Sequence, residues 1–142
     1  MIPVRISVPL AQGGYPILCG SGLLAQVEDW LPFVGNGQVA VVSNRKIFDL
    51  HGGTIAEALD KRALVIHLPD GEQHKNLDTW GVIVDQLAAG GMRRDGTLIA
   101  LGGGLIGDVA GFAAATYMRG VRLLQMPTTL LAQVDAAIGG KT

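Results

Sequence analysis

The chain has 142 residues, of which 49% are hydrophobic and 16% are charged, and this size and composition suit one globular domain with a buried core. A formal net charge of −1 without a basic run argues against nucleic acid as the main partner. No apolar run reaches the length of about 18 residues that a membrane span needs, and the N-terminus lacks the apolar centre of a signal peptide. A single cysteine, Cys19, allows no disulfide within the chain, so we expect a cytoplasmic protein that does not enter a membrane.

The N-terminal part of the chain predicts a hairpin and a helix. Apolar and polar residues alternate from Ile2 to Val8, which is the period of a half-exposed strand. Tyr15–Cys19 can pair with this strand across Gln12-Gly13-Gly14. Ser21 is a candidate N-cap for a helix over Gly22–Trp30, which carries an apolar stripe.

From residue 38 onward, short apolar strands alternate with helices, the order of a parallel sheet with right-handed crossovers. The helix over 76–89 has the clearest end, because Gly90-Gly91 follows its apolar face. We predict an α/β fold in which a Rossmann-like parallel sheet is flanked by helices, with an N-terminal β-hairpin beside it. The predicted strands are 38–42, 63–68, 97–101 and 121–126, and the predicted helices are 46–50, 54–60, 76–89, 106–117 and 128–138.

Three consecutive glycines, Gly102-Gly103-Gly104, follow the strand over 97–101. Without Cβ atoms this turn can take positive φ and let an anion lie against its amides, and the next helix points its N-terminus at the same place. Together with Gly107 the turn satisfies G-x-G-x-x-G between a strand and a helix. The acidic residue that a dinucleotide fold places about 20 positions further on is missing from 122–127. The stretch predicts a phosphate cradle; if NAD binds, its adenine ribose is held from elsewhere.

Polar residues at other predicted strand ends are candidates for a nucleotide site, because ligands of parallel sheets bind beyond the carboxyl ends of the strands. Glu72 can accept from a ribose diol and Lys75 can donate to a hydroxyl or phosphate, although their loop also suits a solvated turn. Asn44 lies where a strand end would meet a ribose, and a plain turn asparagine fits equally well. Asp108, in the first turn of its predicted helix, either stabilises that N-terminus or lies near a nicotinamide.

The C-terminal part of the chain adds further candidates. Thr128 and Thr129 suit an N-cap pair whose hydroxyls would also face the cleft. Arg119 belongs either to a solvated turn or to a phosphate contact. Asp135 lies in an apolar helix and faces either solvent or a site, and Lys141 follows two glycines that give an anion room to approach. The three histidines are scattered and no cluster has metal-ligand spacing, so we predict no metal site within these residues.

Three stretches of the chain resemble the 3-dehydroquinate synthase family: GEQHK at 71–75, LGGGLIGDVAGFAAATYMRGV at 101–121 and QMPTTLLAQVDAAIGGKT at 125–142. The resemblance runs in one register from about Val39 to the last residue. It implies that residues 1–142 form the family's N-terminal, NAD-binding domain, and that the C-terminal domain for metal and substrate lies outside this chain. Because the chain stops in a glycine-rich turn directly after a predicted helix, we also expect it to be a piece of a longer protein.

The resemblance further implies how the cofactor is held. Asn44, Glu72 and Lys75 would bind ribose, the glycine cradle would hold the pyrophosphate, and Asp108 would lie on the nicotinamide side. The NAD-contacting residues that the resemblance implies are Asn44, Glu72, Lys75, Gly103, Gly104, Asp108, Thr128, Thr129 and Lys141.

For catalysis, the resemblance implies substrate contacts from Asp135 and Lys141, and a contact from Arg119 to the substrate phosphate of a neighbouring subunit, hence a homodimer. The family converts 3-deoxy-D-arabino-heptulosonate 7-phosphate into 3-dehydroquinate and phosphate, a lyase reaction of the shikimate pathway. NAD oxidises one secondary alcohol, the ketone acidifies the neighbouring C–H so that phosphate leaves by β-elimination, and the hydride returns. The oxidised carbon is held by a divalent metal, zinc or cobalt, as a Lewis acid. Its ligands would lie outside this chain, so we expect these 142 residues alone to be inactive.

Three other interpretations stay open. A polyol or iron-type alcohol dehydrogenase of the same broad fold would release NADH, whereas the synthase would not. A valiolone-type or inosose synthase shares the NAD chemistry but departs around the Gly-Gly-Lys-Thr turn. The isolated chain can also serve only as a nucleotide-binding or dimerisation module.

Overall fold

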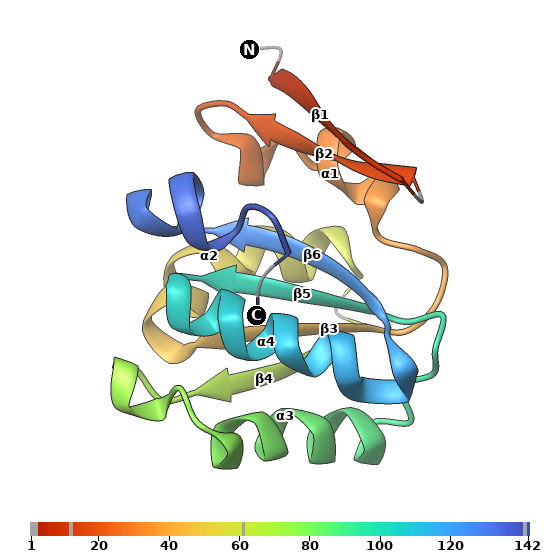
Figure 1. Ribbon diagram of the computed structural model, residues 1–142, viewed down its shortest axis with the longest axis vertical. Helices are drawn as coiled ribbons and strands as arrows, with labels where there is room; N and C mark the ends of the chain where they lie inside the picture. Colours follow the sequence, from red (N-terminus) through yellow and green to blue (C-terminus); the bar gives the residue numbers. More distant parts are fainter. Residues whose placement is uncertain (1–2, 12, 61, 141) are drawn as a thin grey trace.

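The computed structural model describes residues 3–11, 13–60, 62–140 and 142, and it contains two separate sheets (Figure 1). β1 (Val4–Leu10) and β2 (Gly13–Cys19) form an antiparallel hairpin. The larger sheet has four parallel strands in the order β4-β3-β5-β6. The prediction of a parallel α/β sheet with an N-terminal hairpin is therefore confirmed. The strands of the larger sheet are β3 (Val39–Asn44), β4 (Leu64–Leu68), β5 (Thr97–Gly102) and β6 (Arg122–Pro127).

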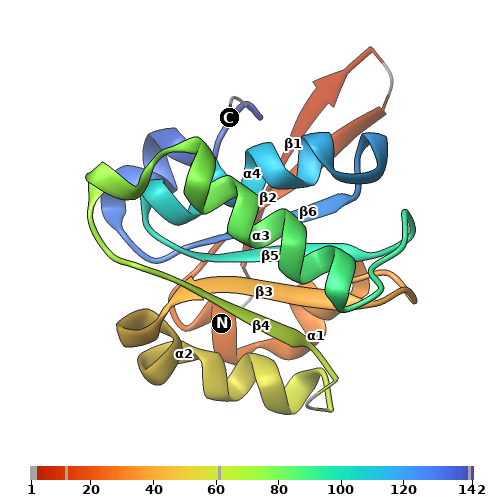
Figure 2. The same cartoon turned by 90° about the horizontal axis from the view of Figure 1, so that it is seen from below.

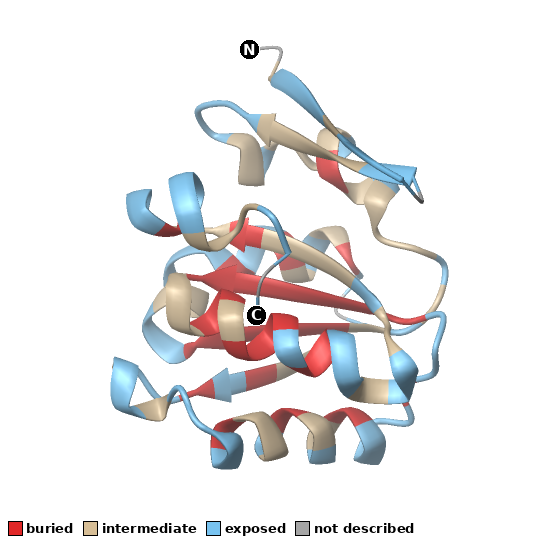
Figure 3. Cartoon of the chain, in the orientation of Figure 1, coloured by how far each residue is buried: buried red, intermediate tan, exposed pale blue. Residues whose placement is uncertain are grey.

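Helices cover both faces of the parallel sheet (Figure 2). On one face lie α3 (Leu77–Ala89) and α4 (Gly104–Thr116), and on the other lie α2 (Arg45–Ala58) and the short α1 (Val27–Trp30). All six residues of β5 are buried, which explains why its sequence is a continuous apolar run and not an alternating one. The core is thus two apolar layers separated by the sheet, with β3 and β5 at its centre (Figure 3).

The chain reverses its direction of travel across the sheet between β3 and β5. From β3 it passes through α2 to β4 on one side, and then crosses through α3 to β5 on the other side of β3. Such a switch point opens a crevice beyond the carboxyl ends of the two strands, which is where ligands bind in sheets of this kind. Asn44 and Gly102 are the last residues of these strands.

Helix α3 ends at the predicted residue and begins one residue later than predicted, at Leu77. The Asn76 Oδ1 atom accepts from the backbone N–H of Thr79 at 2.9 Å, which is an N-cap. Gly90 caps the other end, and Gly91 follows with φ of 70°, a left-handed conformation that favours glycine.

The two helices predicted over 46–50 and 54–60 are a single helix, α2, and the prediction of a break was wrong. The ring of Phe48 lies against Gly52 so closely that a Cβ on Gly52 would approach Phe48 Cδ2 to 2.5 Å. Glycine usually weakens a helix, but here it makes room for an aromatic ring one turn earlier. Packing therefore decides the helix where the local sequence indicates a stop.

The helix predicted over 22–30 with Ser21 as its N-cap was also wrong. The segment consists of a 3₁₀ turn (Leu23–Ala25), α1, and a second 3₁₀ turn (Leu31–Phe33), and no side chain caps the first turn. The indole N–H of buried Trp30 donates to the Leu24 carbonyl at 3.1 Å, an acceptor that a continuous helix would use for its own backbone ladder.

The helix predicted over 128–138 is shorter and partly of another type. Residues 130–131 are α-helical and Ala132–Ala136 form a π-helix, in which the Ala137 N–H donates to the Ala132 carbonyl at 2.9 Å. Single π-helical turns are rare and occur frequently at functional sites.

The hairpin lies outside the main core, and β1 is exposed at nearly every position (Figure 3). The alternation predicted one buried face, but the side chains of Val4 and Ile6 are 63% and 49% exposed. The polar residues Arg5 and Ser7 are exposed as well, and the Arg5 guanidinium lies over the Phe33 ring at 5.8 Å. None of the helices in the described part of the chain has both the length and the apolar character that crossing a membrane requires.

Candidate functional site

The candidate site lies at the carboxyl edge of the parallel sheet, on the left of Figure 1, where four connections meet. β3 ends at Asn44, β4 leads to the 3₁₀ turn Glu72–His74, β5 ends at Gly102, and β6 leads to Thr128. Because all strands of a parallel sheet end at the same edge, the fold gathers candidates that are far apart in the sequence.

The glycine turn forms the N-terminus of α4. Gly103 is the N-cap and no side chain caps this end, so the first-turn amides and the positive end of the helix dipole face the edge. A Cβ on Gly103 would lie 3.3 Å from Thr129 Cγ2, and one on Gly104 would lie 3.8 Å from Ala136 Cβ. None of the three glycines uses the positive φ that the sequence allows. A Cβ on Gly102 or Gly103 would crowd Ile106 or Thr129, whereas one on Gly104 would make an ordinary contact.

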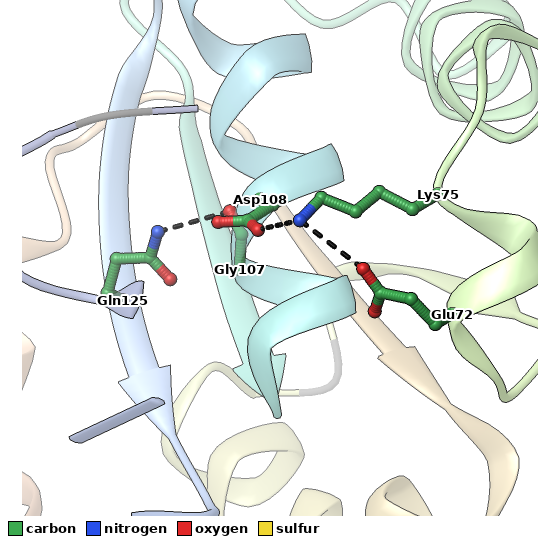
Figure 4. A network of polar contacts seen from close by, with 5 residues as sticks. All are labelled: Glu72, Lys75, Gly107, Asp108 and Gln125. Atoms are coloured by element: carbon green, nitrogen blue, oxygen red, sulfur yellow. Dashed lines mark hydrogen bonds and ion pairs between the residues drawn. The ribbon is translucent and has the colours of Figure 1, made fainter. Parts of the chain in front are cut away.

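An ion-paired cluster lies beside this helix end (Figure 4). The Lys75 Nζ atom is 2.5 Å from Asp108 Oδ2 and 3.5 Å from Glu72 Oε1. Glu72 and Lys75 come from the turn after β4, which Gly71 opens with φ of 106°. Because α4 begins at Gly104, Asp108 lies in its second turn, and the predicted place in the first turn was wrong. Its partner is therefore Lys75 and not the first-turn amides of the helix.

The exposure of the three side chains decides how strongly they interact. Asp108 is 20% exposed, Lys75 is 44% exposed and Glu72 is 75% exposed. The hydrogen bond to Asp108 raises the pKa of Lys75 above the usual 10.5, burial opposes this rise, and the charges of Asp108 and Glu72 add to it. Lys75 therefore holds an ammonium group at the edge of the sheet, between two carboxylates that can accept from hydroxyl groups.

Asn44 has a structural task at this edge. Its Oδ1 atom accepts from the Ile47 N–H at 2.8 Å and caps α2, and the residue is only 9% exposed. Of the two alternatives that the sequence left open, the structure thus shows a local structural role for Asn44. Its predicted contact with a ribose stays a prediction.

Two buried hydroxyl groups near the strand ends lack a hydrogen-bond partner among the described residues, those of Ser43 and Thr128. Leaving a buried polar group unpaired costs about 1–3 kcal/mol. Thr128 lies beside the cradle, since its N–H donates to the Gly102 carbonyl at 2.9 Å. Of the predicted cap pair, only Thr129 caps, because its Oγ1 accepts from the Ala132 N–H at 3.3 Å. Sequence analysis did not select Ser43, although a polar residue at the end of an apolar strand was a usable signal.

Of the remaining candidates, Arg119 is not brought together with this cluster. Arg119 is exposed, with φ of 62°, in the turn Tyr117–Arg119 beyond the C-terminal end of α4. At a rise of 1.5 Å per residue, that end of the helix is about 12 Å from Asp108. Asp135 lies in the π-helical segment after β6 and is exposed to solvent. Lys141 is outside the described residues, so its predicted contacts stay predictions.

Within the described residues, no group of three or more histidine, cysteine, aspartate or glutamate side chains is placed to hold a metal ion. The three histidines belong to different elements, α2, β4 and the turn after β4.

Comparison with known proteins agrees with this geometry. The family model described as 3-dehydroquinate synthase N-terminal matches residues 65–142, which is more than half of the chain and includes the ion-paired cluster and the glycine cradle. The chain belongs to the 3-dehydroquinate synthase family. A 3-dehydroquinate synthase from Saccharophagus degradans is 49% identical over 140 residues, a match that covers 96% of this chain and 38% of the relative. The chain thus spans well under half the length of that family member.

Solved structures of sugar-phosphate cyclases have the same fold. A 2-deoxy-scyllo-inosose synthase complexed with carbaglucose-6-phosphate, NAD⁺ and Co²⁺ matches with a TM-score of 0.82 and 30% identity, covering 93% of this chain and 36% of that one. The 2-epi-5-epi-valiolone synthase ValA from Streptomyces hygroscopicus subsp. jinggangensis 5008, with NAD⁺ and Zn²⁺ bound, matches with a TM-score of 0.76 and 26% identity. This match covers 93% of this chain and 37% of that one.

Proposed function

We propose that the chain is the NAD-binding part of a 3-dehydroquinate synthase, which converts 3-deoxy-D-arabino-heptulosonate 7-phosphate into 3-dehydroquinate and phosphate. The observation that carries the proposal is the ion-paired cluster of Glu72, Lys75 and Asp108 beside the uncapped N-terminus of α4. This places hydroxyl-binding and anion-binding groups next to one another at the switch point of the sheet. A dinucleotide offers both kinds of partner, two riboses and a pyrophosphate.

The described residues fit NAD. No side chain caps the helix end at Gly103 and Gly104, whose amides would hold the pyrophosphate, while Glu72, Lys75 and Asn44 would bind ribose hydroxyls. The buried hydroxyl of Thr128 next to the cradle has no hydrogen-bond partner among the described residues, so a bound ligand would satisfy it, and Thr129 follows it directly. Bound NAD supplies reversible hydride transfer; what the chain itself does is bind, orient and hold charge. Asp108, joined to Lys75, would lie on the nicotinamide side.

The substrate contacts and the assembly are part of the same proposal. Asp135 follows β6 on the edge that carries the cradle, and it is a candidate for the substrate together with Lys141. Arg119 is at the opposite end of α4, and we propose that it contacts the substrate of a neighbouring molecule in a homodimer. A cytoplasmic enzyme suits the single cysteine of the chain.

A divalent metal, zinc or cobalt, completes the proposed enzyme. The described residues offer no ligand set for it, so we assign its ligands to a part of the protein outside this chain and derive no step through it. For the same reason we propose that these 142 residues alone bind cofactor without catalysing the reaction.

One measurement on the full-length protein separates the proposal from its alternatives. The protein is incubated with 3-deoxy-D-arabino-heptulosonate 7-phosphate or with glucose 6-phosphate, and both phosphate and NADH are measured. We expect phosphate release from the heptulosonate that requires NAD and a divalent metal, without net NADH. Net NADH formation would instead indicate a dehydrogenase, and turnover of glucose 6-phosphate alone would indicate another sugar-phosphate cyclase.

A further inference from the structure

Gln125 on β6 contacts α4 from the side opposite to Lys75 (Figure 4). Its Nε2 group donates to the Gly107 carbonyl oxygen at 3.2 Å. Gly107 directly precedes Asp108, whose carboxylate forms the ion pair with Lys75 on the other side of the helix. The second turn of α4 is therefore held by a polar contact on each side.

Two glycines of α4 face Gln125, and at Gly107 the helix backbone comes close to its amide. A Cβ on Gly107 would lie 3.0 Å from Gln125 Oε1, and a Cβ on Gly111 would lie 3.6 Å from Gln125 Nε2. Because neither residue carries a side chain, the amide lies against the helix backbone itself. It therefore fixes the helix directly and not through a second mobile side chain.

Part of the core-facing surface of α4 is smooth. Beside buried Ile106 and Val109 it presents three alanines, Ala110, Ala113 and Ala114, whose small side chains interlock little with their neighbours. Hydrogen bonds are directional, so they add to what apolar packing contributes to the exact setting of such a helix. A binding site needs its groups held within about 0.5 Å of their working positions.

We propose that Gln125 is a positioning residue for the candidate site. Its amide holds the second turn of α4 in the rotation at which Asp108 meets Lys75 and the cradle at Gly103-Gly104 faces the edge of the sheet. Gln125 itself is not required to touch the cofactor. The expected effect of Gln125 on NAD binding rests on the proposed function. Its expected effect on the Lys75–Asp108 pair does not.

The test compares Gln125→Met with Gln133→Met in the full-length protein. Methionine keeps the length of the side chain and removes the amide. Gln133 is a matched control, because its Nε2 also donates to a backbone carbonyl, that of Pro127 at 3.3 Å, and neither residue belongs to α4. The first readout is the pH dependence of Lys75 acetylation, measured by isotope labelling and mass spectrometry without NAD. The second is the affinity for NAD by calorimetry.

We expect the pKa of Lys75 to fall toward its usual value in Gln125→Met only, so that Lys75 is acetylated faster at a given pH. We also expect NAD binding to weaken roughly twofold to tenfold, the range for one lost hydrogen bond. Unchanged Lys75 labelling in a folded Gln125→Met protein would overturn the inference, as would an equal change in Gln133→Met. If the unsubstituted protein does not bind NAD, the proposed function fails while the labelling comparison still decides the role of Gln125.

A second variant covers the case in which Gln125→Met does not fold. In Gln125→Glu the carboxyl group has almost the same shape but can donate only when it is protonated, near its ordinary pKa of about 4.3. Its Lys75 labelling should therefore differ from that of the unsubstituted protein, and its loss of NAD affinity should shrink as the pH is lowered. A loss that is independent of pH would contradict a role for the donated hydrogen bond.

Discussion

The ion pair between Lys75 and Asp108 allows a quantitative test of the candidate site. The perturbation is a double-mutant cycle of Asp108→Asn, Lys75→Met and the two together, which isolates the interaction between the two side chains. A hydrogen bond to a charged group contributes about 1.5–3 kcal/mol, whereas a fully exposed pair contributes about 0.2–1 kcal/mol. Asp108 is 20% exposed but Lys75 is 44% exposed, so solvent screening reduces the larger range. We expect a coupling energy of about 1 kcal/mol, a roughly fivefold effect on the folding equilibrium.

The assay is urea unfolding of the full-length protein and of each variant, followed by tryptophan fluorescence and circular dichroism. The matched control is the cycle for Arg45 and Asp49, a pair at 3.8 Å whose side chains are 78% and 66% exposed. That cycle should give a coupling near zero, because an exposed pair at the surface gains little. A coupling for Lys75 and Asp108 no larger than that of the control would refute the reasoning.

The pH dependence of the same cycle has a defined sign. The folded protein holds the pKa of Lys75 above its usual value, chiefly through the hydrogen bond to Asp108. The stabilisation from Lys75 is therefore fully present below the unfolded pKa of about 10.4, and it is lost as the pH rises through the folded value. We expect equal coupling at pH 7 and pH 9 and a decline only in strongly alkaline solution. A coupling that is lost between pH 7 and pH 9 would contradict this assignment.

Substitutions at three further positions separate structural roles from binding roles, each measured by thermal unfolding and by calorimetry with NAD. Asn44→Ser keeps an N-cap oxygen, so its free energy of unfolding should stay within a few tenths of a kcal/mol, whereas Asn44→Ala should lower it by about 1 kcal/mol. A loss of NAD affinity in the serine variant would support a ribose contact by the amide. Thr128→Val removes a buried hydroxyl that has no partner among the described residues, so we expect unchanged or higher stability together with weaker NAD binding. Lower stability would show that the hydroxyl is satisfied. Gly104→Val adds a side chain whose Cβ has an ordinary contact at 3.8 Å, so the protein should fold while NAD affinity falls about tenfold or more. The control Gly81→Ala, in open space on α3, should leave NAD affinity unchanged.

Much of the local structure could be predicted from the sequence because it depends on neighbouring residues. Asn76 and Gly90-Gly91 mark the two ends of α3 through backbone hydrogen bonds and a left-handed glycine, which are local effects. The continuous apolar run of β5 indicated a strand buried on both faces. These signals, repeated along the chain, were sufficient for the parallel sheet and for the edge at which its polar residues gather.

The local patterns failed where packing between distant segments decides the outcome. Gly52 lies inside α2 because the ring of Phe48 fills the space at its Cα, and the segment after Ser21 breaks because the indole of Trp30 takes a backbone acceptor. The apolar side of β1 is exposed, since the alternation of a strand does not determine which face meets the body. Such contacts carry no signal in the residues on either side.

The candidate site divides in the same way. The sequence by itself identified Glu72, Lys75 and Asp108 as polar residues at strand ends, because strand ends and residue chemistry are both visible in a linear pattern. Only the tertiary structure decided that Lys75 and Asp108 form a pair, since their distance depends on how α4 sits beside the turn after β4. It also decided that the hydroxyl of Thr128 is buried without a partner among the described residues, and that Gln125 reaches the backbone of α4. The physical reason is that composition and spacing fix which groups a chain can offer, while side-chain packing fixes which of them meet.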